Sequence, residues 1–171
     1  NLGIQKARGE YVYFLDADDY VAEPALSALM EAAGEERLLL TGPVAYSWYS
    51  PINFTPDRIQ WENEELVQEE KEADPMTEKD WGKRFATLIS ARHMMIKRSF
   101  LLENQIRFSE NETWHTDVGF MMEVLSGAYE KSYMVPQALY VSRHRNDPVH
   151  FPSLTQQENK ESVQDYKVQY E

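Results

Sequence analysis

An apolar run that stops abruptly at three carboxylates constrains this chain more than any other feature. Residues 11–15, Tyr-Val-Tyr-Phe-Leu, are mostly aromatic or β-branched and have the length of a buried parallel strand. Asp16, Asp18 and Asp19 follow at once. Ligands collect just beyond such strand ends in open α/β sheets, so we expect a binding site at this point.

Three acids within four residues repel one another unless a cation or hydrogen-bond donors lie among them. Mg²⁺ and Mn²⁺ bind carboxylate oxygens and usually keep waters and substrate phosphates as further ligands, which favours a divalent metal site. Asp is also a preferred turn and cap residue. The acids alone therefore leave two interpretations open, a metal site and an Asp-rich turn that caps the next helix.

Composition limits the class of protein. The chain has 171 residues, of which 42% are hydrophobic, so we expect one globular domain with a real core. A net charge of −12 argues against general binding to nucleic acid or anionic membrane. The chain has no cysteine and no apolar segment of membrane-spanning length. We expect a cytoplasmic protein, with peripheral attachment at the inner face of the cell membrane as a further expectation.

The first nine residues predict a short helix before the strand. Asn1 can cap it, Leu2, Ile4 and Ala7 can face a sheet, and Gly9 can end it. A parallel strand needs neighbours on both sides. Either later strands flank residues 11–15, or part of the sheet lies outside this chain.

Residues 1–19 read Asn-x-Gly-x-x-x-Ala-x-Gly-Glu-Tyr-x-x-Phe-Leu-Asp-x-Asp-Asp, which resembles the family 2 inverting glycosyltransferases of the GT-A fold. The resemblance implies an α/β fold with a Rossmann-like mixed sheet. In that family this segment follows strands that hold the nucleotide base, so the resemblance implies that this chain lacks the first nucleotide-binding strands. It also implies that Asp16 and Asp18 lie near a Mg²⁺ or Mn²⁺ ion and a sugar-nucleotide diphosphate. Asp18 is then the direct ligand, and Asp19 supports it or caps a helix.

Further elements follow from local periodicity. Residues 23–33 predict a helix with Leu26, Leu29 and Met30 on one face. Residues 38–41 and 44–48 predict two strands, or one bent strand broken by Gly-Pro. The acidic stretch 62–74 predicts a solvated face or loop, and residues 77–89 predict a helix.

The segment after residue 89 predicts a strand over 90–97, a short helix over 98–104 and a short strand over 106–108. The resemblance implies that this part helps to form the acceptor pocket. His93 is a lone histidine beside a strand, and a structural role is at least as well supported as a catalytic one.

Asp117 is the candidate catalytic residue, at the start of a helix predicted over 117–125 with the inner face Val118, Met121, Met122 and Leu125. In the resembled family a Phe-x-Glu, a spacer and Glu-Asp-x-x-Phe carry the general base, and Asp117 matches its Asp. The base takes a proton from an acceptor hydroxyl, which requires a carboxylate within hydrogen-bond reach. Thr116 stands where the family has Glu. Because Asp also caps helices, a cap role remains the alternative.

Two guanidiniums and an imidazole follow the strand predicted over 139–143. The resembled family returns a segment of this kind to the active site, which implies that Arg143 and Arg145 hold the diphosphate or an anionic acceptor. His144 would complete the metal shell. A surface turn is the alternative.

A narrower resemblance links the chain to glycosyltransferase-type domains of Gram-positive teichoic acid proteins, carried by Lys-Arg-Ser-Phe at 97–100, Asn-x-Ile-Arg-Phe at 104–108 and Arg-Asn-Asp-Pro at 145–148. It implies a cell-wall acceptor, a polysaccharide or polyol phosphate, and a natural chain with further covalent domains. We expect a UDP- or CDP-linked donor. An exposed apolar sheet edge beside residues 11–15 is also expected, and it would favour a homo-oligomer. We expect residues 1–150 to form the catalytic, acceptor-side part of the domain and 151–171 a tail helix or linker. A binding module without catalysis, holding a cell-wall polymer or a partner enzyme, is the rival function.

Overall fold

The computed structural model describes residues 1–49, 58–61, 73–77, 90–111, 116–145, 149, 150 and 152. The predicted acidic loop, the helix at 77–89 and the tail at 151–171 lie almost wholly outside these residues. In chain order the elements are α1 (Leu2–Lys6), β1 (Tyr11–Tyr13), β2 (Tyr20–Val21), α2 (Ala25–Glu31), β3 (Leu39–Thr41), β4 (Val44–Tyr49), β5 (Arg58–Trp61), β6 (Asp74–Pro75), β7 (Met94–Lys97), α4 (Arg98–Glu103), α5 (Thr116–Ala128), the 3₁₀ helix η2 (Tyr129–Lys131), β8 (Ser132–Met134) and β9 (Tyr140–Arg145).

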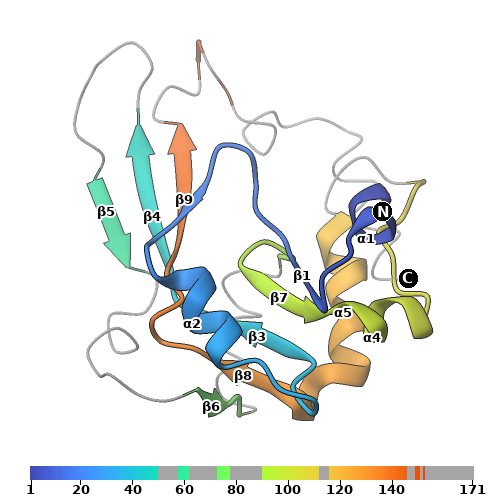
Figure 1. Ribbon diagram of the computed structural model, residues 1–171. Helices are drawn as coiled ribbons and strands as arrows, with labels where there is room; N and C mark the ends of the chain where they lie inside the picture. The colour runs from blue at the N-terminus through green and yellow to red at the C-terminus, as the bar shows by residue number, and fades with distance from the viewer. Residues whose placement is uncertain are drawn as a thin grey trace.

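The strands form two mixed sheets (Figure 1). Within the described residues, the larger sheet has the order β1-β7-β3-β8-β6 and the smaller one β2-β9-β4-β5. β3 is parallel to β8 and β4 is parallel to β9, whereas the other pairs are antiparallel. This confirms the mixed α/β sheet. The neighbour of β1 in the described residues, β7, runs antiparallel to it, so the parallel pairing expected of β1 is not found on that side. β1 is half-buried at the edge of the described sheet.

The chain passes twice from the larger sheet to the smaller one, along adjacent paths. β3 continues into β4 through Gly42, and β8 continues into β9 past Ala138. The predicted break at Gly42 is confirmed, and its two strands belong to different sheets. The parallel pairs β3–β8 and β4–β9 therefore join the two sheets side by side.

Helices cover both faces of the larger sheet (Figure 1). Successive strand residues point to opposite faces, so Leu39 packs with α4 and α5 while Leu40 packs with α2. The α4–α5 side carries the larger apolar cluster, and the rings of Phe108 and Phe120 stack within it at 4.0 Å. The core thus lies on both sides of the strands that lead to the site.

Two helices form as predicted, and each buries only part of its expected face. In α2, Leu26 and Met30 are 49% and 55% exposed, and Leu29 is buried together with Ala25. In α5, Met122 is 54% exposed, and the buried stripe consists of Phe120, Met121, Val124, Leu125 and Ala128. Leu29, Met121 and Leu125 are buried as predicted. Phe120, which was not predicted on the inner face of α5, is buried where its ring stacks on Phe108.

Asn1 has a tertiary role instead of the predicted cap. Its side chain makes no cap hydrogen bond, and it pairs with the backbone of Phe108 by donating from Nδ2 to the carbonyl and accepting at Oδ1 from the amide, both at 2.9 Å. The predicted strand over 106–108 does not form. The side-chain amide of Asn1 makes the two hydrogen bonds that a neighbouring strand would make, and it holds residues 106–108 beside α1.

A single pair of glycine substitutions tests the crossing between the sheets. A Cβ at Gly42 would overlap the carbonyl oxygen of Ala138, whereas a Cβ at Gly119 in α5 meets nothing within 4 Å. We expect Gly42→Ala to lower the free energy of unfolding by about 3 kcal/mol because backbone must move. Gly119→Ala should raise it by about 0.5–1 kcal/mol. Urea unfolding of both variants measures this, and equal effects would contradict the close crossing.

Candidate active site

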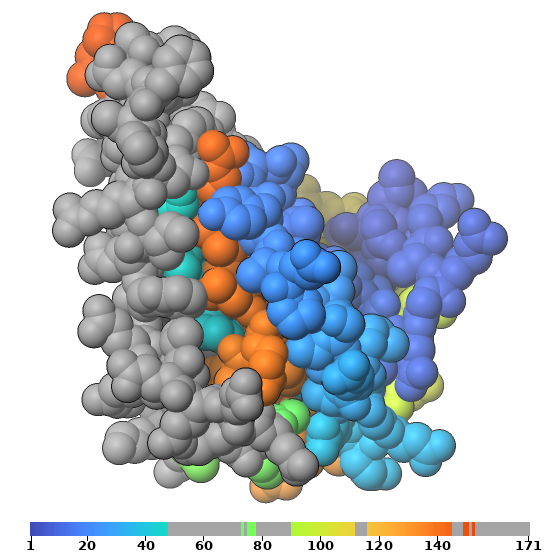
Figure 2. All heavy atoms as spheres, turned by 60° about the vertical axis from the view of Figure 1, so that its left-hand side comes forward, coloured from blue at the N-terminus to red at the C-terminus, as the bar shows by residue number. Residues whose placement is uncertain are grey.

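The acidic turn after β1 lies at the junction of the two sheets. The backbone amide of Asp19 donates to the carbonyl of Asp16 at 3.1 Å, which closes the turn between β1 of the larger sheet and β2 of the smaller. β2 then pairs with β9, and Figure 2 shows the orange atoms of β9 beside blue atoms of the N-terminal segment. The predicted binding region therefore lies where both sheets contribute residues.

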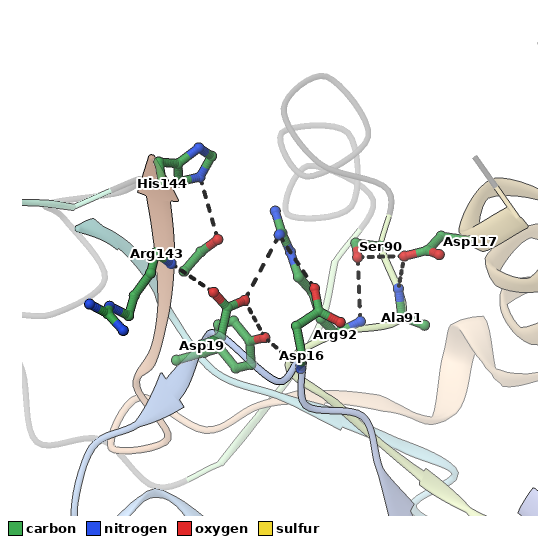
Figure 3. Close-up of polar contacts among 10 residues, drawn as sticks. Asp16, Asp19, Ser90, Ala91, Arg92, Asp117, Arg143 and His144 are labelled. Carbon is green, nitrogen blue, oxygen red and sulfur yellow. Dashed lines mark hydrogen bonds and ion pairs between the residues drawn. The ribbon is translucent and has the colours of Figure 1, made fainter. Parts of the chain in front are cut away.

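Asp19 is buried and saturated by hydrogen bonds. Its side chain is 2% exposed, and its two oxygens accept from the Tyr140 hydroxyl at 2.6 Å and from the Arg143 amide at 2.7 Å. The same hydroxyl accepts from the amide of Asp16 at 3.3 Å. Burial and the hydrogen bond to Asp19 raise the pKa of Tyr140, so its hydroxyl remains a donor at neutral pH. These contacts tie the acidic turn to β9 (Figure 3).

Asp16 and Asp18 remain open to solvent. The side chain of Asp16 is 58% exposed, and Asp18 is exposed as well. Burial raises the pKa of Asp16, the carboxylates of Asp19, Asp117 and Asp18 add to that rise, and the Arg92 guanidinium opposes it. Asp16 thus carries a negative charge that the protein itself does not fully compensate.

The loop at residues 90–93 connects both ends of the site (Figure 3). Its predicted strand begins only at Met94, because His93 has a left-handed φ of 62° and turns the chain. The His93 ring is buried edge-on against Tyr140, in a structural position. Arg92 Nη1 lies 3.8 Å from Asp16 Oδ2 and 3.9 Å from Asp19 Oδ2. Sequence reasoning missed Arg92 and Tyr140, since both were placed in strands as ordinary strand residues.

Asp117 lies in the first turn of α5 and is held by this loop. Its Oδ2 accepts from the Ser90 hydroxyl at 2.7 Å and from the Ala91 amide at 3.2 Å. Asp117 also acts electrostatically on Asp16. The structure therefore places Asp117 and the acidic turn on either side of residues 90–92, through contacts that the sequence did not indicate.

The basic residues of β9 divide between its two faces. Figure 3 shows the Arg143 guanidinium directed away from the acids, although its amide binds Asp19. His144 has the opposite orientation, with Nε2 3.4 Å from Ser142 Oγ and its ring edge-on to Tyr46. Burial and the Arg92 charge lower the pKa of His144, which favours the neutral, metal-binding form. Arg145 ends β9 opposite Tyr49, and its side chain lies outside the described part.

The site suits a hard cation whose ligands are mostly water and phosphate, with only a few from the protein. Within the described residues, no three His, Asp or Glu side chains lie close enough together to hold a metal ion. Asp16 and Asp18 are exposed carboxylates, and Mg²⁺ is commonly bound by one or two of these with water and phosphate completing its shell. The residues present therefore fit a Mg²⁺ or Mn²⁺ ion, and the assignment of Asp16, Asp18 and His144 stays a prediction.

A family model described as glycosyl transferase family 2 matches residues 1–115, which include the acidic turn and the 90–93 loop. The chain belongs to this family. The family resemblance seen in residues 1–19 is thereby confirmed. A helix able to cross a membrane is not found in the part of this family 2 chain that the structure describes.

One curated protein is similar to this chain in sequence, and several solved structures are similar to it in fold. The chain is 27% identical over 149 residues to the uncharacterized glycosyltransferase EpsJ of Bacillus subtilis (strain 168), covering 84% of this chain and 40% of EpsJ. The crystal structure of S. aureus TarS 1-349 in complex with UDP-GlcNAc matches with a TM-score of 0.58 and 19% identity, covering 95% of this chain and 39% of that one. The complex with UDP matches with a TM-score of 0.60 and 20% identity, covering 84% and 38%. These likenesses confirm the GT-A fold, and the chain spans less than half the length of each relative.

The hydroxyl of Tyr140 is expected to stabilise the acidic turn. Tyr140→Phe removes the donor to the buried Asp19 carboxylate, so we expect the free energy of unfolding to fall by about 2–3 kcal/mol. Tyr20→Phe removes a hydroxyl from an exposed side chain of β2 and serves as the control. Urea unfolding at neutral pH compares the two, and equal losses would mean that the Tyr140 hydroxyl does not hold the turn.

The raised pKa of Asp16 gives a pH-dependent prediction. A carboxyl with a raised pKa binds its proton more tightly in the folded state, so its contribution to stability declines as pH rises. Asp16→Asn should therefore increase the free energy of unfolding at neutral pH, and the difference should vanish at about pH 3. Glu123→Gln, on the exposed face of α5, controls for net charge. If Asp16→Asn raised the free energy of unfolding equally at neutral pH and at about pH 3, the raised pKa of Asp16 would be contradicted.

Proposed function

We propose that this chain forms the acceptor-side part of a glycosyltransferase that transfers a sugar from a nucleotide diphosphate to a hydroxyl, with inversion. The observation that carries the proposal is the meeting of Asp117 with the acidic turn. These residues come from distant segments, and the 90–93 loop holds them at one sheet junction. The family supports glycosyl transfer as the reaction class.

Asp117 is the proposed general base. Ser90 and Ala91 both donate to Oδ2, which fixes the carboxylate and leaves Oδ1 for a substrate. Asp117 accepts the proton of the acceptor hydroxyl as that oxygen attacks the anomeric carbon, while the bond to the diphosphate breaks on the opposite side. A single in-line displacement of this kind inverts the anomeric centre.

Asp16, Asp18 and His144 are the proposed residues for Mg²⁺ or Mn²⁺. When bound, the ion supplies positive charge to the departing diphosphate. Asp16 and Asp18 are exposed toward solvent, and His144 lies within electrostatic reach of Asp18 and Asp19. Asp19 is left out of this set because its side chain is only 2% exposed and is held by Tyr140 and Arg143.

The donor is proposed to be UDP- or CDP-linked. The TarS structures named with UDP and UDP-GlcNAc support the uridine alternative. Arg143 and Arg145 are the proposed contacts for the diphosphate or an anionic acceptor. Because the Arg143 guanidinium is directed away from the acids in Figure 3, the anionic acceptor is the better-supported ligand for Arg143. We propose a polysaccharide or polyol-phosphate acceptor of the cell wall, teichoic acid included, and a site of action at the cytoplasmic face of the cell membrane.

One observation favours a binding module without catalysis. Thr116 begins α5 where the resembled family has a carboxylate beside the base. A module of this kind would hold a polymer or a partner enzyme with the same fold. Metal-dependent nucleotide binding and turnover distinguish it from the enzyme.

The decisive experiment compares two variants of the full-length protein. Asp117→Asn should keep Mn²⁺-dependent UDP binding and lower kcat with a UDP-sugar by about 10²–10⁴-fold, because the acceptor proton then has no base. Asp18→Ala should lose the Mn²⁺ dependence of UDP binding. Calorimetry and sugar-transfer assays measure both.

Glu123→Gln is the matched control for Asp117→Asn, since it makes the same kind of change on the exposed face of the same helix. It should leave binding and turnover unchanged. Absence of UDP binding in the unmodified protein would reject the enzyme and favour the binding module.

A further inference from the structure

Arg92 places a fixed positive charge at the centre of the site. Its side chain is 19% exposed, and its guanidinium lies between Asp16 and Asp19. It acts electrostatically on Asp16 and on His144 as well. Asp16 and Asp19 of the acidic turn both lie beside this cation, so it is close to any ligand that reaches the turn.

The surrounding carboxylates do not use the donors of this guanidinium. The two contacts of Nη1, at 3.8 and 3.9 Å, exceed the 2.7–3.2 Å range of hydrogen bonds, and the buried Nε has no hydrogen-bond partner among the described residues. An arginine that served only as a counter-ion would form close, paired hydrogen bonds to a carboxylate. Asp19 has no need of it, since Tyr140 and Arg143 already satisfy both oxygens.

We infer that Arg92 donates hydrogen bonds to a phosphate group of a ligand bound at the acidic turn. The planar fork of a guanidinium matches two phosphate oxygens, and its charge offsets repulsion between that phosphate and the neighbouring aspartates. The Arg143 guanidinium is directed away from the acids in Figure 3, so Arg92 is the better-placed cation. This inference rests on the proposed function for its ligand, a phosphate of the donor or of a polyol-phosphate acceptor.

Inorganic pyrophosphate is the first probe, because its binding needs no nucleotide pocket. With Mg²⁺ in excess, the full-length protein and its Arg92→Lys and Arg92→Gln variants are titrated with pyrophosphate, UDP and uridine. We expect pyrophosphate and UDP to bind at least about tenfold more weakly to Arg92→Gln, with Arg92→Lys between, and uridine to bind unchanged. Arg37→Lys is the control. The Arg37 guanidinium donates a hydrogen bond to the Ala32 carbonyl and stacks on the Tyr133 ring, away from the site.

A second arm identifies the source of the phosphate. If Arg92→Lys raises KM for a glycerol-phosphate oligomer and leaves UDP affinity unchanged, the phosphate belongs to the acceptor; the reverse result assigns it to the donor. Unchanged affinity for every phosphate ligand would overturn the inference. Equal loss of uridine and UDP binding, with a lower melting temperature, would overturn it too by showing a purely structural counter-ion. Arg92-dependent pyrophosphate binding without nucleotide-sugar binding would reject the proposed function while the inference stands.

Discussion

The arrangement of this site depends on one buried carboxylate. Removing the charge of Asp19 from water costs several kcal/mol unless donors replace the hydration, and the Tyr140 hydroxyl and the Arg143 amide do so at 2.6 and 2.7 Å. Both donors belong to β9, whereas Asp19 follows β1. A carboxylate that is stable only in this contact therefore fixes the turn of one sheet against a strand of the other. Asp16 and Asp18 acquire their positions from that connection.

The 90–93 loop extends the same connection to the helix side. Ser90 and Ala91 hold Asp117, Arg92 faces Asp16 and Asp19, and the His93 ring packs on Tyr140. Four consecutive residues thus contact Asp16, Asp19, Asp117 and Tyr140, and the left-handed φ of His93 lets the loop turn directly into β7. A shift of this loop would move the proposed base and the guanidinium together, because Ser90 and Ala91 hold Asp117 and Arg92 belongs to the same loop.

The sequence predicted features that depend on nearby residues. The acidic turn, the break at Gly42 and α5 follow from local periodicity and turn chemistry, and the family pattern indicated Asp117. Features set by distant contacts were missed or wrong. Tyr140 resembles any core residue of a strand until β2 pairs beside it. The antiparallel direction of β1 depends on its neighbour β7, which lies far along the chain and was not predicted to pair with it. The opposite faces of Arg143 and His144 were predictable from strand alternation, but which face meets the acids depended on the sheet order.

Asp16 and Asp19 differ little in sequence and greatly in chemistry. Both are aspartates of one four-residue turn, yet Asp19 is saturated by the protein while Asp16 is exposed and has a raised pKa. An ionised Asp16 lowers stability at neutral pH, so folding alone gives no reason for it, nor for an arginine beside it whose donors are unused. A carboxylate and a guanidinium held close together without hydrogen bonds between them can each bind a ligand of opposite charge. The proposed ligand, a metal-bound diphosphate, carries both charges, so its metal would match the exposed carboxylate and its phosphate would match the guanidinium.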